Sequence, residues 1–190
     1  KICYFWRVRL LAVTVSATEL GNYAVRYPCM RCAWVRMHVK DLPYQSFPGI
    51  FSTIDSYSKK VVLSHFNVND CLPLWLADLG KVEECVEPPS WRKFSSTDDM
   101  TGVTVRGTAD AIFLLRDGSY GIADYKTSRY NPTRTTALAA YEIQLNAYAW
   151  IAERTGFQPV NSLALVFMEP EGDVPSDAES TPVGPKGFAL

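Results

Sequence analysis

The stretch from Gly107 to Tyr148 constrains the fold of this chain more than any other. Residues 108–115, TADAIFLL, alternate as a β-strand does, and the Asp-Gly pair at 117–118 is a strong signal for a hairpin turn. The returning strand, YGIADYK, ends in a polar connector that leads to a helical segment, YEIQLNAYAWIAE. This order predicts a hairpin followed directly by a helix that packs on the sheet.

Two loop lengths are compatible with the hairpin, and they place its carboxylates differently. A two-residue loop sets Asp110 opposite Tyr125, whereas a three-residue loop with Gly118 in the left-handed region sets Asp110 opposite Asp124. We expect the three-residue loop, because two carboxylates and the ammonium of Lys126 then gather at one end of one sheet face. Such a cluster is costly unless a cation lies between the carboxylates, so the sequence predicts a metal site there.

The helix after the hairpin adds polar groups on one face. Gln144 and Tyr148 are four residues apart, so they share a side of the helix. We expect Thr135 or Thr136 to cap its N-terminus. The connector before the helix carries Arg129 and Arg134, two candidates for contacts with a nucleic-acid backbone.

The rest of the chain supplies the elements around this unit. We expect an edge strand before residue 16, a helix capped by Ser16 or Thr18 and an amphipathic helix over residues 50–61. Lys59 and Lys60 of the latter are expected near its end, on a solvated face. Residues 67–99 read as short irregular elements, and residues 163–168 as a buried strand. The predicted organisation is an N-terminal extension or edge strand (residues 1–15), one domain (16–170) and a Pro-rich tail or truncated end (171–190).

Composition bounds the function. The 190 residues fit a single domain, and a net charge of −1 requires any nucleic-acid contact to be local. No apolar run approaches the roughly 20 residues of a membrane helix. The five cysteines have irregular spacing, which favours a reducing compartment, and we expect a cytoplasmic protein. Cys29 and Cys32 form a C-x-x-C pair without two further ligands nearby, so we expect two partly buried thiols on a helix.

The central motifs resemble those of the PD-(D/E)XK nuclease superfamily, in particular its RecB-like and Cas4-like branch. A G-x-x-D precedes the hairpin, a D-x-K lies on the returning strand, and a Q-x-x-x-Y lies on the next helix. The matching residues are Gly107, Asp110, Asp124, Tyr125, Lys126, Gln144 and Tyr148. This resemblance implies an α/β, restriction-endonuclease-like fold, with a central mixed β-sheet flanked by helices on both faces.

The resemblance also implies an activity. Asp110 and Asp124 would bind Mg²⁺ or Mn²⁺, with the Tyr125 carbonyl as a further oxygen ligand. Lys126, Gln144 and Tyr148 would serve hydrolysis of DNA phosphodiester bonds in repair, recombination or defence. A helicase or a CRISPR-type protein is a candidate partner, and no membrane is expected. The absence of any cysteine after Cys85 argues against a [4Fe–4S] cluster. The alternative is a catalytically inactive nucleic-acid-binding or scaffolding domain of the same fold.

Overall fold

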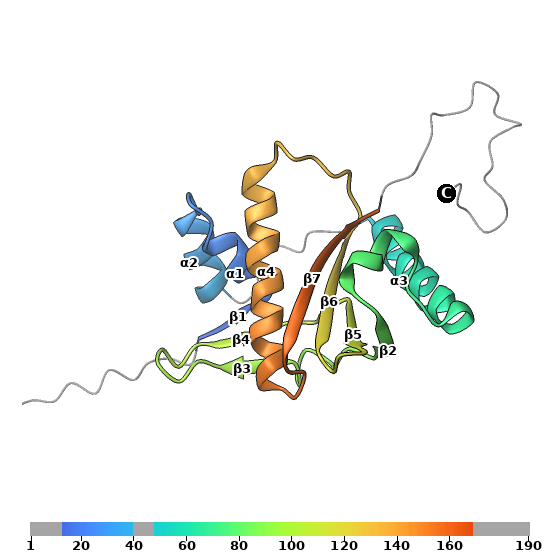
Figure 1. Cartoon of the computed structure of the whole chain (residues 1–190). Helices are drawn as coiled ribbons and strands as arrows, with labels where there is room; N and C mark the ends of the chain where they lie inside the picture. The colour runs from blue at the N-terminus through green and yellow to red at the C-terminus, as the bar shows by residue number, and fades with distance from the viewer. Residues whose placement is uncertain (1–12, 40–47, 169–190) are drawn as a thin grey trace, which may run out of the picture.

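The computed structural model describes residues 13–39 and 48–168 (Figure 1). The predicted Pro-rich tail and most of the predicted N-terminal extension lie outside these residues. The elements in chain order are β1 (Thr14–Ser16), α1 (Ala17–Tyr23), α2 (Met30–His38), α3 (Gly49–Asn69), the 3-10 helix η1 (Leu74–Leu79), β2 (Val82–Val86), β3 (Ser95–Thr97), β4 (Thr104–Arg106), β5 (Ala111–Leu115), β6 (Tyr120–Lys126), α4 (Thr135–Arg154) and β7 (Val160–Phe167).

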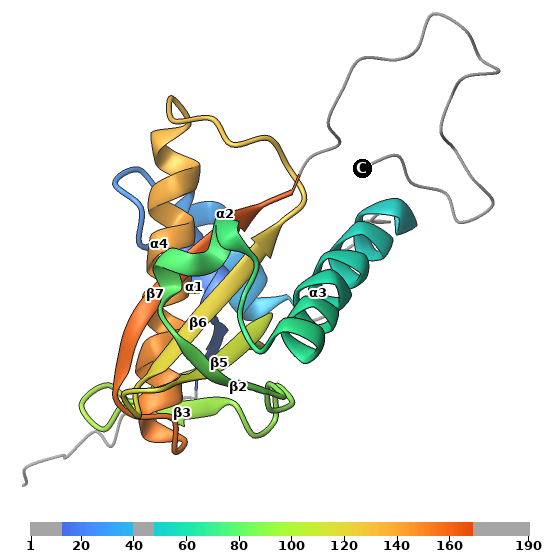
Figure 2. The same cartoon turned by 45° about the vertical axis from the view of Figure 1, so that its right-hand side comes forward.

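Two mixed sheets form the centre, where the sequence predicted one. The larger has the order β2-β5-β6-β7, with β6 and β7 parallel and the other neighbours antiparallel. The smaller has the order β1-β4-β3, with β1 parallel and β3 antiparallel to β4. Helix α4 covers one face of the larger sheet and α3 and η1 lie on the other, while α1 packs against α4 (Figure 2). The predicted α/β class, a mixed sheet between helical layers, is confirmed.

The β5–β6 hairpin has the three-residue loop that the sequence favoured. Ala111 pairs with Ala123, so one residue further out Asp110 stands opposite Asp124. The turn ends on Gly118, whose φ of +82° lies in the left-handed region that favours glycine. The register that brings the two motif carboxylates to the same end of the sheet is therefore confirmed.

Strand β6 supplies side chains to both helical layers. Ile122 packs in the core on the α4 side, whereas Ala123 and Tyr125 pack in the core on the α3 side. All residues from 121 to 125 are buried, because helices cover both faces. Side chains alternate along a strand, so the neighbours Asp124 and Tyr125 face different layers.

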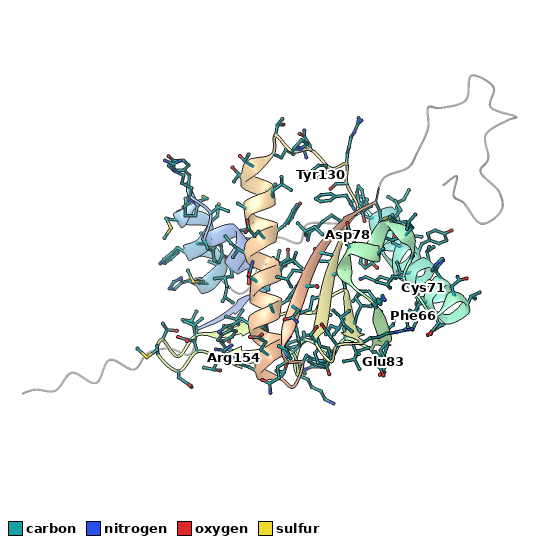
Figure 3. The ribbon with its side chains drawn as sticks, viewed as in Figure 1. Phe66, Cys71, Asp78, Glu83, Tyr130 and Arg154 are labelled. Carbon is teal, nitrogen blue, oxygen red and sulfur yellow. The ribbon has the colours of Figure 1, made fainter. Side chains whose placement is uncertain are left out.

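Helix α4 connects β6 to its parallel neighbour β7, which makes residues 120–167 a βαβ unit. An aromatic contact links the connector before α4 to this unit. The Tyr130 ring lies edge-on to Phe167, with 5.2 Å between the ring centroids (Figure 3). Three motifs of the predicted site, D-x-K, the arginine-bearing connector and Q-x-x-x-Y, thus belong to one continuous segment.

The helix ends agree in part with the predictions. Ser16 caps α1 as expected: its hydroxyl accepts a 3.1 Å hydrogen bond from the Glu19 N–H, and the Glu19 carboxylate accepts one from the Ser16 N–H. The predicted cap of α4 is wrong, because Arg134 is the N-cap residue and Thr135 is already helical. Helix α3 extends to Asn69, beyond the predicted segment. No helix in residues 13–39 and 48–168 has the length and apolarity to cross a membrane.

Candidate active site

Polar side chains gather at the end of the larger sheet where β5 begins and β6 ends. Asp110 directly precedes β5, and Asp124 and Lys126 lie in the last three residues of β6. Helix α4 adds Gln144 and Tyr148, both buried. The fold therefore brings five of the predicted site residues to one edge of the sheet.

Gln144 makes three side-chain hydrogen bonds, and two of them join helix α4 to strand β6. Its Oε1 accepts a bond from Lys126 Nζ at 3.1 Å. Its Nε2 donates to Asp124 Oδ1 at 3.1 Å and to the Tyr148 hydroxyl at 2.8 Å. Because both the donor and the acceptor of the amide are used, these contacts fix its orientation.

Lys126 lies between an acid and an aromatic ring. Its Nζ is 2.5 Å from Asp124 Oδ2 and 4.4 Å from the centroid of the Tyr141 ring. The contact with Asp124 is therefore a short, charge-assisted ion pair. The ammonium is thus held by charge, by the Gln144 amide and by a cation–π contact.

The electrostatics of Asp124 favour a bound cation. Burial raises the pKa of Asp124 above its ordinary value, and the charge of Asp110 also raises it. Lys126 and Lys59 lower the pKa, but the net direction is upward. Burial also raises the pKa of Tyr148 to about 12, so this phenol is neutral at pH 7 and acts in hydrogen bonding.

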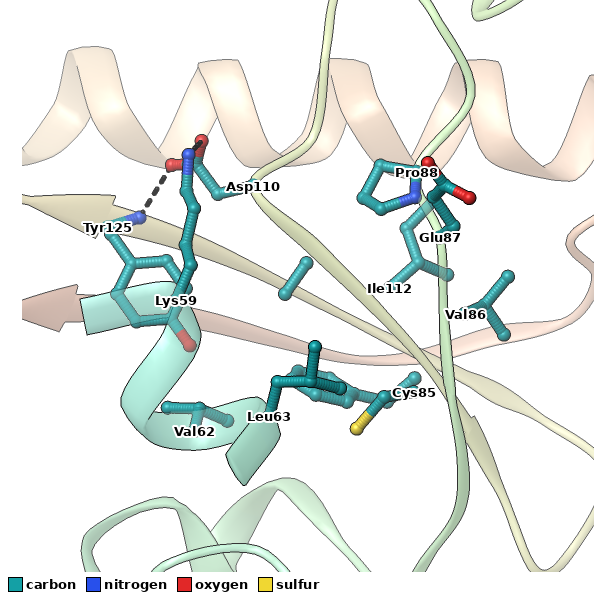
Figure 4. Close-up of a pocket in the computed structure, with 12 residues that line it drawn as sticks. Lys59, Val62, Leu63, Cys85, Val86, Glu87, Pro88, Asp110, Ile112 and Tyr125 are labelled. Atoms are coloured by element: carbon teal, nitrogen blue, oxygen red, sulfur yellow. Dashed lines mark hydrogen bonds and ion pairs between the residues drawn. The ribbon is translucent and has the colours of Figure 1, made fainter. Parts of the chain in front are cut away.

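Asp110 is held by the backbone of β6 and by helix α3. Its Oδ2 accepts a 2.8 Å hydrogen bond from the Tyr125 N–H, and its Oδ1 lies 2.7 Å from Lys59 Nζ (Figure 4). The expectation that Lys59 is a solvated residue near a helix end is wrong, because it is half-buried near the middle of α3. Asp55 shares this ammonium, at 2.7 Å.

Sequence reasoning missed Asp55 and the inward role of Lys59. The available signal was their spacing of four residues, which places an acid and an ammonium on one face of a helix. That spacing is common on solvated helices, and it does not indicate which strand the face will meet. The contact with Asp110 depends on tertiary packing across 51 positions of the chain.

A cavity of about 400 Å³ opens beside the Lys59–Asp110 pair, between α3 and strands β2 and β5 (Figure 4). Its walls are largely apolar, with Val62, Leu63 and Phe113 among the lining residues. The site is therefore bordered on the α3 side by an apolar cavity whose walls include residues of the core.

The donor set fits a hard divalent cation. Asp110 and Asp124 offer carboxylate oxygens, the ligands that Mg²⁺ and Mn²⁺ prefer. Each carboxylate already has a lysine ammonium against it, which shows that the negative charge of the two acids is compensated by cations. Within residues 13–39 and 48–168 no three side chains of His, Cys, Asp or Glu form a group able to hold a metal. Side-chain ligation would therefore come from two carboxylates, with other oxygens completing the coordination.

The two arginines predicted to contact nucleic acid lie at the surface. Arg129 and Arg134 are exposed in the connector between β6 and α4, which starts directly after the Lys126 end of β6. Their predicted contact with a nucleic-acid backbone stays a prediction.

The expectation of two partly buried thiols at Cys29 and Cys32 is wrong, because both side chains are exposed. Cys29 is the N-cap residue of α2, and its thiol accepts a hydrogen bond from the Cys32 N–H at 3.3 Å. Only Ala33 of α2 is buried, so this helix presents its cysteines outward. The two sulfur atoms lie 2.8 Å apart, and hydrogen bonding between the two thiols lowers the pKa of Cys29.

Comparison with known proteins agrees with this geometry. No curated protein gives a significant match to the chain. A family model described as the PD-(D/E)XK nuclease superfamily matches residues 68–183, which is more than half of the chain. The matched segment contains Asp110, the D-x-K strand and the Q-x-x-x-Y helix, and α3 lies almost entirely before it. The match and the convergence of these motifs at one sheet edge lead to one conclusion: the chain belongs to the PD-(D/E)XK nuclease superfamily.

Proposed function

We propose that this chain is a Mg²⁺- or Mn²⁺-dependent nuclease that hydrolyses phosphodiester bonds of DNA. The observation that carries the proposal is the register of the hairpin, which sets Asp110 opposite Asp124. Lys126 lies beside them, held by Gln144. A phosphodiester needs both a nucleophile and compensation of negative charge, and this group of side chains can support both.

Asp110 and Asp124 would hold the metal, and the Tyr125 carbonyl is the further oxygen ligand that we propose. A bound Mg²⁺ or Mn²⁺ supplies a water of lowered pKa and offsets the charge of the phosphate. The support for this assignment is the hard-oxygen donor set together with the upward pKa shift of Asp124, since a nearby cation reverses such a shift.

The chain's own cations and amides complete the site. Lys126 would orient the attacking water or stabilise charge that develops on the phosphate. Gln144 would position Lys126, and Tyr148 would position Gln144, through the hydrogen bonds described above. Arg129 and Arg134 would contact phosphates of the nucleic-acid backbone, because they are exposed on the connector next to this edge.

The biological setting follows from the resemblance of the motifs to the RecB-like and Cas4-like branch. We propose a role in DNA repair, recombination or defence in the cytoplasm, with a helicase or CRISPR-type protein as partner. G-x-x-D, D-x-K and Q-x-x-x-Y support this placement, because they occur here in that order within residues 107–148.

The experiment is cleavage of end-labelled single- and double-stranded DNA and of RNA, with Mn²⁺ and with EDTA. Wild type should cleave DNA only with the metal, and Asp124→Ala and Lys126→Ala should not. Glu142→Ala, an exposed acid on α4, is the matched control and should retain activity. Equal cleavage by all four proteins would mean that the activity does not come from this site. Binding without cleavage by the wild type would favour an inactive nucleic-acid-binding domain.

A further inference from the structure

The ammonium of Lys59 lies between two carboxylates from different parts of the fold. Its Nζ is 2.7 Å from Asp55 Oδ2, one helical turn earlier on α3. It is also 2.7 Å from Asp110 Oδ1, just before β5, a contact that Figure 4 shows. The three side chains are 33%, 35% and 20% exposed, so the group is partly shielded from water. The Lys59 ammonium therefore already lies against Oδ1 of Asp110.

This arrangement compensates charge that the fold has brought together. Asp110 stands opposite Asp124, and two carboxylates at one sheet edge repel each other. Lys126 pairs with Asp124 and Lys59 pairs with Asp110, so each acid has one ammonium. Lys59 therefore supplies the positive charge that offsets the charge of Asp110.

Both oxygens of Asp110 already have a partner, and the ammonium on one of them repels an incoming metal ion. Oδ2 accepts the Tyr125 N–H, and Oδ1 faces Lys59. The backbone bond comes from a strand buried on both faces and is the harder of the two to break. The Lys59 side chain is a flexible four-carbon chain. Its ammonium can stay paired with Asp55, on the same helix, after it leaves Asp110.

We propose that Lys59 is a counter-cation that is paired with Asp110 in the metal-free protein and leaves Asp110 when a divalent ion binds. The displaced ammonium stays paired with Asp55, which thus acts as its tether. Lys59 is therefore a positioning residue that sets metal affinity. The proposal rests on the proposed function to the extent that a divalent ion binds at Asp110.

The test is calorimetric titration of Mn²⁺ into the full chain. Lys59→Met removes the competing cation and should lower the Mn²⁺ dissociation constant by roughly fivefold, the factor expected for one partly exposed ion pair. Lys60→Met is the matched control, because it removes a charge from the next, exposed position of the same helix. Its dissociation constant should stay within about twofold of that of the wild type, since exposed charges are screened.

A double-mutant cycle tests the role of Asp55. Asp55→Asn alone should weaken Mn²⁺ binding, because the displaced ammonium then has no second partner. In the Lys59→Met background the same change should leave the dissociation constant unaltered. Weaker binding in that background would make Asp55 a metal ligand and would overturn its role as the tether.

The outcomes separate this proposal from the proposed function. Equal Mn²⁺ affinity of Lys59→Met and Lys60→Met, with binding still abolished by Asp124→Ala, would overturn the Lys59 proposal alone. Absence of Mn²⁺ binding in the wild type and in Lys59→Met would overturn both. Thermal unfolding in EDTA gives a readout without metal: Lys59→Met should lower the unfolding temperature more than Lys60→Met, and added Mn²⁺ should remove that difference.

Discussion

Gly107, the first residue of the G-x-x-D motif, is expected to be intolerant of even one methyl group. A Cβ at this position would lie 2.4 Å from Cε1 and 3.0 Å from Cδ1 of the Tyr148 ring. Carbon atoms pack at about 3.5–4.0 Å, so the ring would have to move by about 1 Å. The Tyr148 side chain is only 4% exposed, and its hydroxyl accepts a hydrogen bond from Gln144, so the ring has little room to move. Glycine at position 107 therefore lets the backbone lie close to this ring.

The expected cost of Gly107→Ala follows from this overlap. Overpacking of a core costs about 1–3 kcal/mol, and alanine recovers about 0.4–1 kcal/mol by restricting the unfolded chain. We expect a net loss of about 1–2 kcal/mol in the free energy of unfolding, measured by urea denaturation in EDTA. Because the displaced ring is bonded to Gln144, cleavage of DNA should fall as well.

Gly49→Ala is the control. A Cβ at Gly49, the first residue of α3, has no heavy atom within 4 Å, so the substitution gives the backbone gain without the overlap. A second variant, Tyr148→Leu, removes the ring atoms, and Gly107→Ala should cost less in that background. Equal stability of Gly107→Ala and Gly49→Ala, or an unchanged cost in the Tyr148→Leu background, would refute the steric explanation.

Three further predictions concern polar and reactive groups. Gln144→Leu leaves polar groups of Lys126 and Asp124 without their hydrogen-bond partner. It should lower the free energy of unfolding by about 1–3 kcal/mol, measured by chemical denaturation. It should also lower the rate of DNA cleavage roughly ten- to a hundredfold, measured by DNA digestion. Folding raises the pKa of Asp124. At pH values just above the ordinary carboxyl pKa, the folded state therefore binds more protons than the unfolded state. In that range the stability of the metal-free protein should fall as pH rises. Asp124→Asn should flatten this slope in urea titrations, and an unchanged slope would contradict the assignment. Finally, iodoacetamide should modify Cys29 faster than Cys85 in peptide mapping, because Cys29 is exposed with a lowered pKa, whereas burial raises the pKa of Cys85 to about 11.

Local signals made the centre of the fold predictable. The turn at Gly118 and the alternation of β5 fix the register of Asp110, and both are properties of neighbouring residues. The spacing of Gln144 and Tyr148 fixes their common face in the same way, through the period of the helix. These features needed no knowledge of distant contacts.

Features that depend on distant packing were not predictable in this way. Strand β2 lay in a stretch read as irregular, because it is an edge strand with exposed Glu83 and Glu84 and a register shift between Val82 and Glu84. Charges and bulges are common on edge strands, and they hide the alternation of apolar residues. The exposure of Cys29 likewise depends on α2 lying outside the main core, which the spacing within the helix does not reveal.

The continuity of β6, α4 and β7 has a consequence for local unfolding. Segments that are contiguous and well packed tend to open as one cooperative unit, and buried central strands open last. We expect the amides of β6 to exchange slowly with solvent and those of α3, many of whose side chains are exposed, to exchange faster. Asp124, Lys126, Gln144 and Tyr148 would then stay assembled while α3 opens and closes. Lys59 and Asp55 would leave and rejoin the site with that helix, on a timescale that hydrogen exchange can measure.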